Sequence, residues 1–113
     1  MIDEQVIAVL RASLSDDGTI IGQLISLYAT DSPQMVNDAF AAIERHDWET
    51  LKRSAHSLKS TSASMGATTA SAVARELEQF AKDGNLEQAA ATLARLKIEV
   101  DDAIAALSKL KFG

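Results

Sequence analysis

Apolar residues recur three and four positions apart along most of this 113-residue chain. That spacing matches the period of an α-helix, whereas a half-buried β-strand alternates every second residue. Helix-forming residues dominate, and no runs of β-branched residues occur. The chain is long enough for one domain with a modest core. We therefore predict an all-α fold over residues 1–113, an antiparallel four-helix bundle with a short additional N-terminal helix.

Helix-breaking and capping residues divide the chain into predicted helices. The first runs from Asp3 to Leu14, and Ser32-Pro33 has the local pattern of an N-cap followed by a first helical residue. The remaining boundary signals, in chain order, are Asp16-Asp17-Gly18 (stop), Thr19 (N-cap), Asp47 (N-cap), Gly66 (stop), Thr68 or Thr69 (N-cap) and Gly84-Asn85 (stop and N-cap), with Gln88 completing a capping box.

The predicted core follows from the same spacing. Met35 and Met65 are read as core filler. The other residues expected to face the core outside the histidine helix are Val6, Ile7, Leu10, Ile21, Leu24, Ile25, Tyr28, Val73, Leu77, Phe80, Leu86, Ala90, Leu93, Leu96, Val100, Ile104 and Leu107.

One predicted helix carries a histidine on its outer face. Its apolar stripe consists of Trp48, Leu51, Ala55, Leu58, Ser62 and Met65. At about 100° per residue, His56 lies about 130° from the centre of that stripe. We therefore expect the imidazole to point toward water or a partner, with one ring nitrogen exposed and unpaired.

The helical neighbours of His56 are cationic or small. They are Lys52 and Arg53 one turn before, Lys59 and Ser60 one turn after, and Ala63 two turns after. Lys and Arg repel a metal ion but favour an anion at the ring nitrogen. The small residues leave room for a partner surface to approach.

The charge distribution points the same way. Residues 50–75 contain four bases and no acid, whereas the whole chain has 11 bases, 16 acids and a net charge of −5. The remainder thus has 7 bases against 16 acids, or −9. Such a local basic patch can steer an acidic partner onto this helix. It is too small to predict nucleic-acid binding, for which the whole domain is normally basic.

Several other classes of protein are disfavoured. The chain has no cysteine and no Glu-x-x-His pair, so thiolate and di-iron sites are not expected, and we predict neither a metal nor a cofactor. No apolar run approaches the roughly 20 residues of a membrane span, and the N-terminus is unlike a signal peptide. We expect a cytoplasmic monomer. We interpret His46 as a helix C-terminal cap.

The segment around His56 resembles a known signature. His56, Leu58, Lys59, Ser62 and Gly66 match H-x-L-K-G-x-S-x-x-x-G, the signature of histidine-containing phosphotransfer (HPt) domains, at the family's spacing. Ser60 departs from it, because the signature has Gly there. The likeness extends to Asp31-Ser32-Pro33 and to the run Arg75-Glu76-Leu77-Glu78 that closes at Gly84, and so covers essentially the whole chain.

The resemblance implies roles for these residues. His56 would be the phosphoacceptor, and Lys59 would lie beside the phosphoryl group and neutralise it. Ser62 and Gly66 would serve helix packing and helix ending, while the Ser60 hydroxyl can bond back to the carbonyl of residue 56. The family also favours one long helix, kinked at Pro33, that runs to about Arg45 with Val36, Phe40 and Ile43 on its apolar face.

The function implied is that of a phosphorelay intermediate. A receiver domain that holds a phospho-Asp and Mg²⁺ would pass the phosphoryl group to His56, which would pass it to a second receiver Asp. A hybrid sensor histidine kinase is the expected upstream partner. The chain would be a stoichiometric carrier rather than an enzyme, either as a separate protein or as a module of a larger kinase. Lys52, Arg53, Ser60 and Ala63 are expected to line the docking surface, which Glu78 and Lys82 can approach.

Two alternatives stay open at this point. An HPt-like interaction module would bind a signalling partner through the same face without carrying phosphate. A ligand-binding or metal-binding four-helix bundle is disfavoured, because the paired ligands that such bundles use are missing.

Overall fold

The computed structural model describes residues 2–14 and 19–110, and every regular element in that part of the chain is a helix. The all-α prediction is therefore confirmed. The predicted break at Asp16-Asp17-Gly18 lies outside the described residues. The helices are α1 (Glu4–Leu14), α2 (Thr19–Glu44), α3 (Trp48–Ser64), α4 (Thr68–Asp83) and α5 (Leu86–Ser108).

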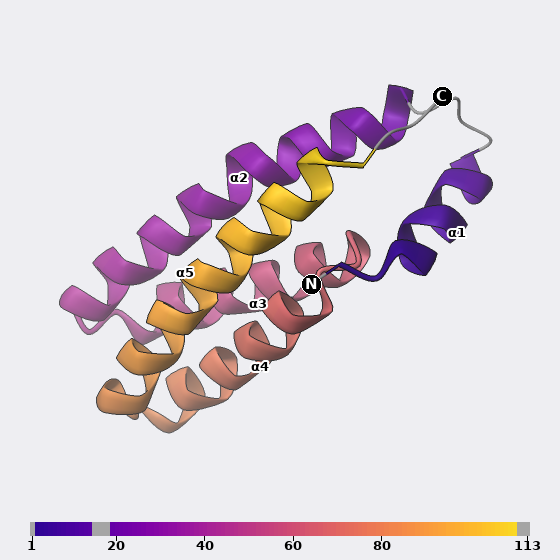
Figure 1. Ribbon diagram of the computed structural model, residues 1–113. Helices are drawn as coiled ribbons and strands as arrows, with labels where there is room; N and C mark the ends of the chain where they lie inside the picture. The colour runs from indigo at the N-terminus through magenta and orange to yellow at the C-terminus, as the bar shows by residue number, and fades with distance from the viewer. Residues whose placement is uncertain (1, 15–18, 111–113) are drawn as a thin grey trace.

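Four long helices, α2 to α5, lie side by side in an elongated bundle, and the shorter α1 lies beside one end of it (Figure 1). Each long helix contacts two others, in the cyclic order α2, α3, α4, α5. Two or three residues connect each of these helices to the next, and so short a connection forces neighbours to run antiparallel. The described residues measure 45 × 20 × 20 Å. No helix among them is both long and apolar enough to span a membrane.

Helix α2 continues through Pro33 as one element of 26 residues. A proline inside a helix removes one backbone hydrogen bond, but the apolar face that follows it keeps the same register. Val36, Ala39 and Ala42 are buried there, as are Ile21 and Tyr28 before the proline. The local indication of a helix start at Ser32-Pro33 is therefore wrong, and the long helix favoured by the family resemblance is confirmed.

Two of the predicted N-caps are confirmed. The side chain of Asp47 accepts a hydrogen bond from the backbone N–H of Thr50 at 3.1 Å. The side chain of Asn85 does the same for the N–H of Gln88 at 3.2 Å. The full capping box is wrong, however, because the N–H of Asn85 donates to the Phe80 carbonyl rather than to Gln88.

Two other predicted caps are corrected. The N-cap of α4 is Ala67, which makes no side-chain capping bond, and Thr68 is already helical. Ala67 is fully buried, so at this position packing against the core outweighs the capping preference. Thr19 is likewise the first residue of α2 rather than the residue before it.

Three helices end in a left-handed residue, which lets the next N–H reach back to a carbonyl five residues earlier. These residues are His46 (φ 55°), Gly66 (φ 73°) and Gly84 (φ 67°). The returning bonds run from Asp47 to Ala42, from Ala67 to Ser62 and from Asn85 to Phe80, at 2.8, 2.8 and 3.0 Å. His46 thus lies at a helix C-terminus as predicted, and its backbone conformation forms the turn into the histidine helix.

Most residues predicted for the core are buried, but alanines form a larger part of it than predicted. Leu86 and Ala90 are exposed. The predicted core residues that are only partly buried are Val6, Leu10, Leu24, Ile25, Met35, Phe40, Ile43, Trp48, Phe80 and Ile104. Leu86 begins α5 at the end of the bundle, and Ala89 takes the inward position in place of Ala90. The additional core residues are Ala39, Ala42, Ala67, Ala70, Ala74, Ala81, Ala89, Thr92 and Ala103.

Helices α3 and α4 are closely paired because small side chains fill the space between them. Ala55 on α3, and Ala70 and Ala74 on α4, are all at most 1% exposed. A side chain of α4 also bonds directly to the backbone of α3, since Ser71 Oγ donates to the Lys59 carbonyl at 2.9 Å. Close packing of this kind fixes which residues of α4 can reach the outer face of α3.

Gly66 meets two backbone requirements, and we predict that alanine there is destabilising. Its positive φ costs an L-residue about 1–2 kcal/mol, and an added Cβ would lie 2.6 Å from the Asp3 carbonyl oxygen. The N–H of Asp3 also donates to the Gly66 carbonyl at 2.7 Å. Gly84 is the matched control, because its φ is similar but no atom lies within 4 Å of the added Cβ. Urea unfolding should show a clearly larger loss for Gly66→Ala than for Gly84→Ala, and equal losses would contradict this account.

Candidate functional site

His56 lies on the outer face of α3 with 62% of its side chain exposed. One ring nitrogen nevertheless has a protein partner, because Nδ1 lies 2.9 Å from Oε2 of Glu78 on α4. The other nitrogen, Nε2, has no hydrogen-bond partner among residues 2–14 and 19–110. The predicted geometry, one exposed and unpaired ring nitrogen, is therefore present, and the rest of the ring is fixed from the α4 side.

Glu78 also binds the lysine of the signature. Its second oxygen, Oε1, accepts a hydrogen bond from Lys59 Nζ at 2.7 Å. Glu78 is only 8% exposed, so its carboxylate is largely removed from water and is paired on both oxygens. One carboxylate on α4 thus holds two side chains that are one turn apart on α3. Lys59 is therefore ion-paired in this state rather than free beside the ring.

The partner of Nδ1 determines which ring nitrogen carries the proton. An ionised carboxylate can only accept hydrogen bonds. Nδ1 must therefore donate its N–H to Glu78, and in the neutral ring Nε2 then holds the lone pair. The arrangement aims the nucleophilic nitrogen of His56 outward from the bundle.

The surroundings of Glu78 keep it ionised. The hydrogen bond from Lys59 is the largest cause that lowers its pKa below the ordinary value; burial opposes the shift, and the bond from His56 adds to it. A carboxylate that accepts hydrogen bonds from two donors is stabilised in its ionised form and is negative at neutral pH. It is therefore available as an acceptor for Nδ1–H throughout the physiological range.

The ring lies at the edge of an open hollow of about 330 Å³ between α3 and α4. Its lining includes three cations, Lys52, Arg53 and Lys82, but also the carboxylates of Glu49 and Glu78. The locally basic region predicted around His56 thus also contains two carboxylates. Packing brings in Glu78, 22 positions along the chain, and Glu49 lies one residue outside the acid-free segment.

The four residues predicted to line a docking surface lie on the face of α3 that carries His56. Lys52 is half-buried and bonds to Glu49 at 3.0 Å, whereas Arg53, Ser60 and Ala63 are exposed. No bond from the Ser60 hydroxyl to the His56 carbonyl occurs in the described part of the chain. That hydroxyl is therefore available at the surface.

The direct role of Glu78 was missed by the sequence analysis, although a signal for it exists. Ala74, Leu77 and Ala81 are buried on α4, and Glu78 falls within their inward-facing stripe. A carboxylate at such a position needs charged or hydrogen-bonding partners. What the spacing could not supply is the register of α4 against α3, and hence the identity of those partners.

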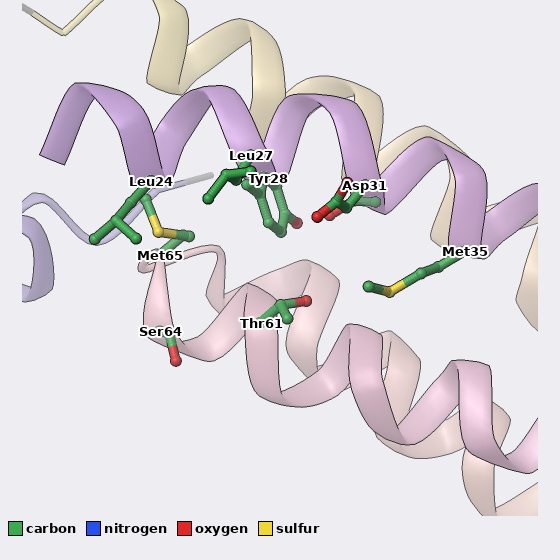
Figure 2. A pocket seen from close by; sticks show the side chains of 9 residues that line it. Leu24, Leu27, Tyr28, Asp31, Met35, Thr61, Ser64 and Met65 are labelled. Carbon is green, nitrogen blue, oxygen red and sulfur yellow. The ribbon is translucent and has the colours of Figure 1, made fainter. Parts of the chain in front are cut away.

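A second hollow, of about 200 Å³, lies between α2 and α3. Figure 2 shows Leu24 and Met65 at one end of it and Met35 at the other, with Tyr28 and Thr61 between them. Tyr28 Oη and Ser62 Oγ are 2.8 Å apart in the bundle interior. Burial raises the pKa of Tyr28, which keeps the phenol neutral. Ser62, predicted to be a small packing residue, thus also satisfies a buried polar group.

No cluster of three potential metal-binding side chains occurs within the described ranges. The chemistry that this surface offers is that of a nucleophilic nitrogen beside several cations. Such a site can accept or hold an anionic group.

The ion pairs of Glu78 predict an acid-dependent loss of stability. The pKa of Glu78 is lowered in the folded protein. Ionised Glu78 therefore adds to the free energy of unfolding at every pH above the ordinary carboxyl pKa near 4.3. This stabilisation is lost as the pH falls through the lower pKa of the folded state. Between about pH 5 and pH 3, Glu78→Gln should therefore lose less free energy of unfolding than the wild type. Glu76→Gln, which removes an exposed carboxylate 3.6 Å from Arg95, should keep the wild-type slope. Parallel urea-unfolding curves for Glu78→Gln and wild type across this range would contradict the assignment.

Comparisons with known proteins agree with this geometry. The sequence model of the family described as Hpt domain matches residues 23–108. The chain is 29% identical over 100 residues to histidine-containing phosphotransfer protein 4 of Arabidopsis thaliana. This alignment covers 87% of the present chain and 79% of the plant protein.

Two solved structures are similar in fold. Histidine-containing phosphotransfer protein B (HptB) of Pseudomonas aeruginosa PAO1 has a TM-score of 0.86 and 27% identity, covering 96% of this chain and 91% of that one. The histidine-containing phosphotransfer protein ZmHP2 of maize has a TM-score of 0.77, covering 96% and 85% of the two chains. At 20% identity, the maize protein supports the fold alone.

The family match includes every residue of the site described above. His56, Lys59 and Glu78 all fall within residues 23–108, as do all of α3 and α4. The match also covers most of α2 and ends with the last residue of α5. The chain therefore belongs to the Hpt domain family and is a phosphorelay intermediate of two-component signalling.

Proposed function

We propose that His56 accepts a phosphoryl group on Nε2 from the phospho-Asp of a receiver domain and passes it to the Asp of a second receiver. The observation that carries this proposal is the exposed ring of His56, held by a contact of 2.9 Å between Nδ1 and Glu78, from which we infer that Nε2 holds the lone pair. A neutral imidazole is a good nucleophile at pH 7. The chain acts as a stoichiometric carrier, because the phosphoryl group leaves it unchanged when it moves on.

The transfer step balances without a proton moving. The Nε2 lone pair forms a bond to phosphorus while the bond from phosphorus to the receiver carboxylate oxygen breaks, and that carboxylate leaves with the electron pair. The ring then carries the phosphoryl group on Nε2 and a positive charge shared with Nδ1–H. Glu78 already lies against that proton. Mg²⁺ belongs to the receiver, which supplies most of the charge stabilisation in the transition state.

Lys59 supplies a positive charge close to the ring. In the unphosphorylated protein its ammonium group bonds to Glu78, and only 27% of its side chain is exposed. A phosphoryl group on Nε2 would compete with Glu78 for this ammonium group, since both are anions. Lys59 therefore stabilises the phosphorylated state by turning part of its bonding toward the phosphoryl oxygens.

The surface around His56 fits a receiver domain that presents an acidic site. Arg53 and Lys82 are exposed beside the hollow, and Lys52 stands next to them, so their charges can steer and orient the partner. Ser60 and Ala63 are small and exposed on α3, so they leave room for the partner surface. We expect a hybrid sensor histidine kinase upstream, a cytoplasmic location and a monomeric chain.

A pure interaction module remains the second candidate. It would use the same surface, but it would have no need for a ring nitrogen held outward by a buried carboxylate. The bonds from Glu78 to His56 and Lys59 favour the carrier, and phosphate labelling distinguishes the two.

We predict that a phosphorylated receiver labels this protein with phosphate that is stable to alkali and labile to acid, as expected for phosphohistidine. His56→Gln should abolish the label, because it removes the only nucleophile proposed. His46→Gln is the matched control, since the other histidine lies in the turn before α3, and it should label like the wild type. Label that persists in His56→Gln would refute the carrier role at this residue.

We further predict that Lys59→Ala slows transfer from the receiver to His56. A hydrogen bond to a charged group contributes about 1.5–3 kcal/mol when shielded and less at a surface, so the rate should fall roughly tenfold. Single-turnover transfer measures this directly. Lys97→Ala removes a lysine that pairs with Asp101 on α5, and it should leave the rate unchanged. An unaltered rate in Lys59→Ala would exclude the proposed charge role.

A further inference from the structure

We propose that the Glu78 carboxylate shortens the lifetime of phosphorylated His56 by holding the proton on Nδ1. This inference rests on the proposed function and extends it. It assigns Glu78 as a positioning residue that sets how readily the phosphoryl group leaves, in addition to orienting the ring.

The argument begins with the leaving group. When the P–N bond breaks, its electron pair returns to Nε2, and the phosphoryl group passes to the oxygen of water or of a receiver carboxylate. If Nδ1 carries a proton, the ring leaves as neutral imidazole. If Nδ1 has lost that proton to solvent, the ring must leave as an imidazolate anion, which is a far poorer leaving group. Protonation of Nδ1 therefore controls the rate of loss.

The structure places one anion directly on that proton. Oε2 of Glu78 lies 2.9 Å from Nδ1, and the carboxylate is 8% exposed, so water screens the interaction only weakly. A hydrogen bond from the charged form of a ring to a carboxylate favours that charged form. The phosphorylated ring thus keeps the proton it had before transfer, and it is released as the same tautomer that attacked.

The other charged groups around the ring do not substitute for Glu78. Lys59 on α3 and Lys82 on α4 are positive and oppose a cationic ring, as do Lys52 and Arg53. Glu49 also lines the hollow, but it is exposed and bonds to Lys52 at 3.0 Å. Glu78 is the carboxylate that touches the imidazole within the described residues.

A carboxylate at this position suits a carrier that donates rapidly. An amide would orient the ring equally well through its oxygen, but it carries no charge to hold the Nδ1 proton. Glu78 therefore favours a short-lived phosphohistidine that passes its phosphoryl group on in either direction. It disfavours a long-lived phosphohistidine that would store the group.

The test uses the full chain labelled chemically with phosphoramidate, a small phosphoryl donor, so that no receiver is needed. After removal of the donor, the loss of label is followed at pH 7.5. Glu78→Gln should retain its label about tenfold longer than the wild type, because a single charge at this distance changes a protonation equilibrium by about that factor. Glu76→Gln, two residues away on a different side of the same helix and paired with Arg95, should decay like the wild type.

A second arm separates the ring proton from Lys59, which Glu78→Gln also releases. The same comparison is made between Lys59→Ala and the double variant Lys59→Ala/Glu78→Gln. Longer retention in the double variant supports an action of Glu78 on the ring itself. If the effect of Glu78→Gln disappears in the Lys59→Ala background, Glu78 acts only through Lys59 and the inference is overturned.

The pH dependence provides a readout that loss of structure would not imitate. The wild type should lose its label rapidly up to a higher pH than Glu78→Gln does. The curve of label-loss rate against pH should therefore lie at lower pH for Glu78→Gln than for the wild type. Circular dichroism verifies that the variants are folded. Glu78→Asp keeps the charge on a shorter side chain, so its rate of label loss should lie between those of the wild type and Glu78→Gln. Superimposed profiles would overturn the inference alone, whereas a wild type that takes no label at His56 would overturn the proposed function with it.

Discussion

A single buried carboxylate, Glu78, connects the packing of the bundle to the chemistry of its surface. It bonds to Nδ1 of His56 at 2.9 Å and to Nζ of Lys59 at 2.7 Å, and both partners lie on the neighbouring helix. Because a carboxylate only accepts hydrogen bonds, this contact fixes the ring and its tautomer together. The small residues between α3 and α4 bring Glu78 close enough to make it. The reactivity of the exposed ring thus depends on the interior packing of two helices.

Much of the fold follows from local patterns in the sequence. Helical spacing of apolar residues, the N-caps Asp47 and Asn85 and the left-handed Gly66 and Gly84 are short-range signals, and the structure agrees with each. The failures occur where tertiary contacts override a local preference. Ala67 begins α4 in place of a threonine because it is buried, and α2 continues through Pro33 because the apolar face on both sides of it packs in one register.

The site was only half predictable for the same reason. The exposure of His56 follows from its angle on one helix, which the sequence determines. The engagement of Lys59 depends on Glu78, 19 residues away on another helix, and no pattern within α3 contains that information. Segment 50–75 contains no acid, yet Glu49 and Glu78 line the hollow beside His56, because distance along the chain does not measure distance in space. A buried position for a carboxylate was the available signal, without the identity of its partners.

The most direct test of this account is the tautomer of His56 in the unmodified protein. Nitrogen-15 NMR of the imidazole ring, recorded at a pH where the ring is neutral, distinguishes a protonated nitrogen from one with a free lone pair. We predict one dominant form, with the proton on Nδ1 and the lone pair on Nε2, and a coupling pattern that changes in Glu78→Ala, which removes the acceptor of the Nδ1–H. A dominant Nε2–H form, or a ring whose tautomers are unaffected by Glu78, would contradict the central claim.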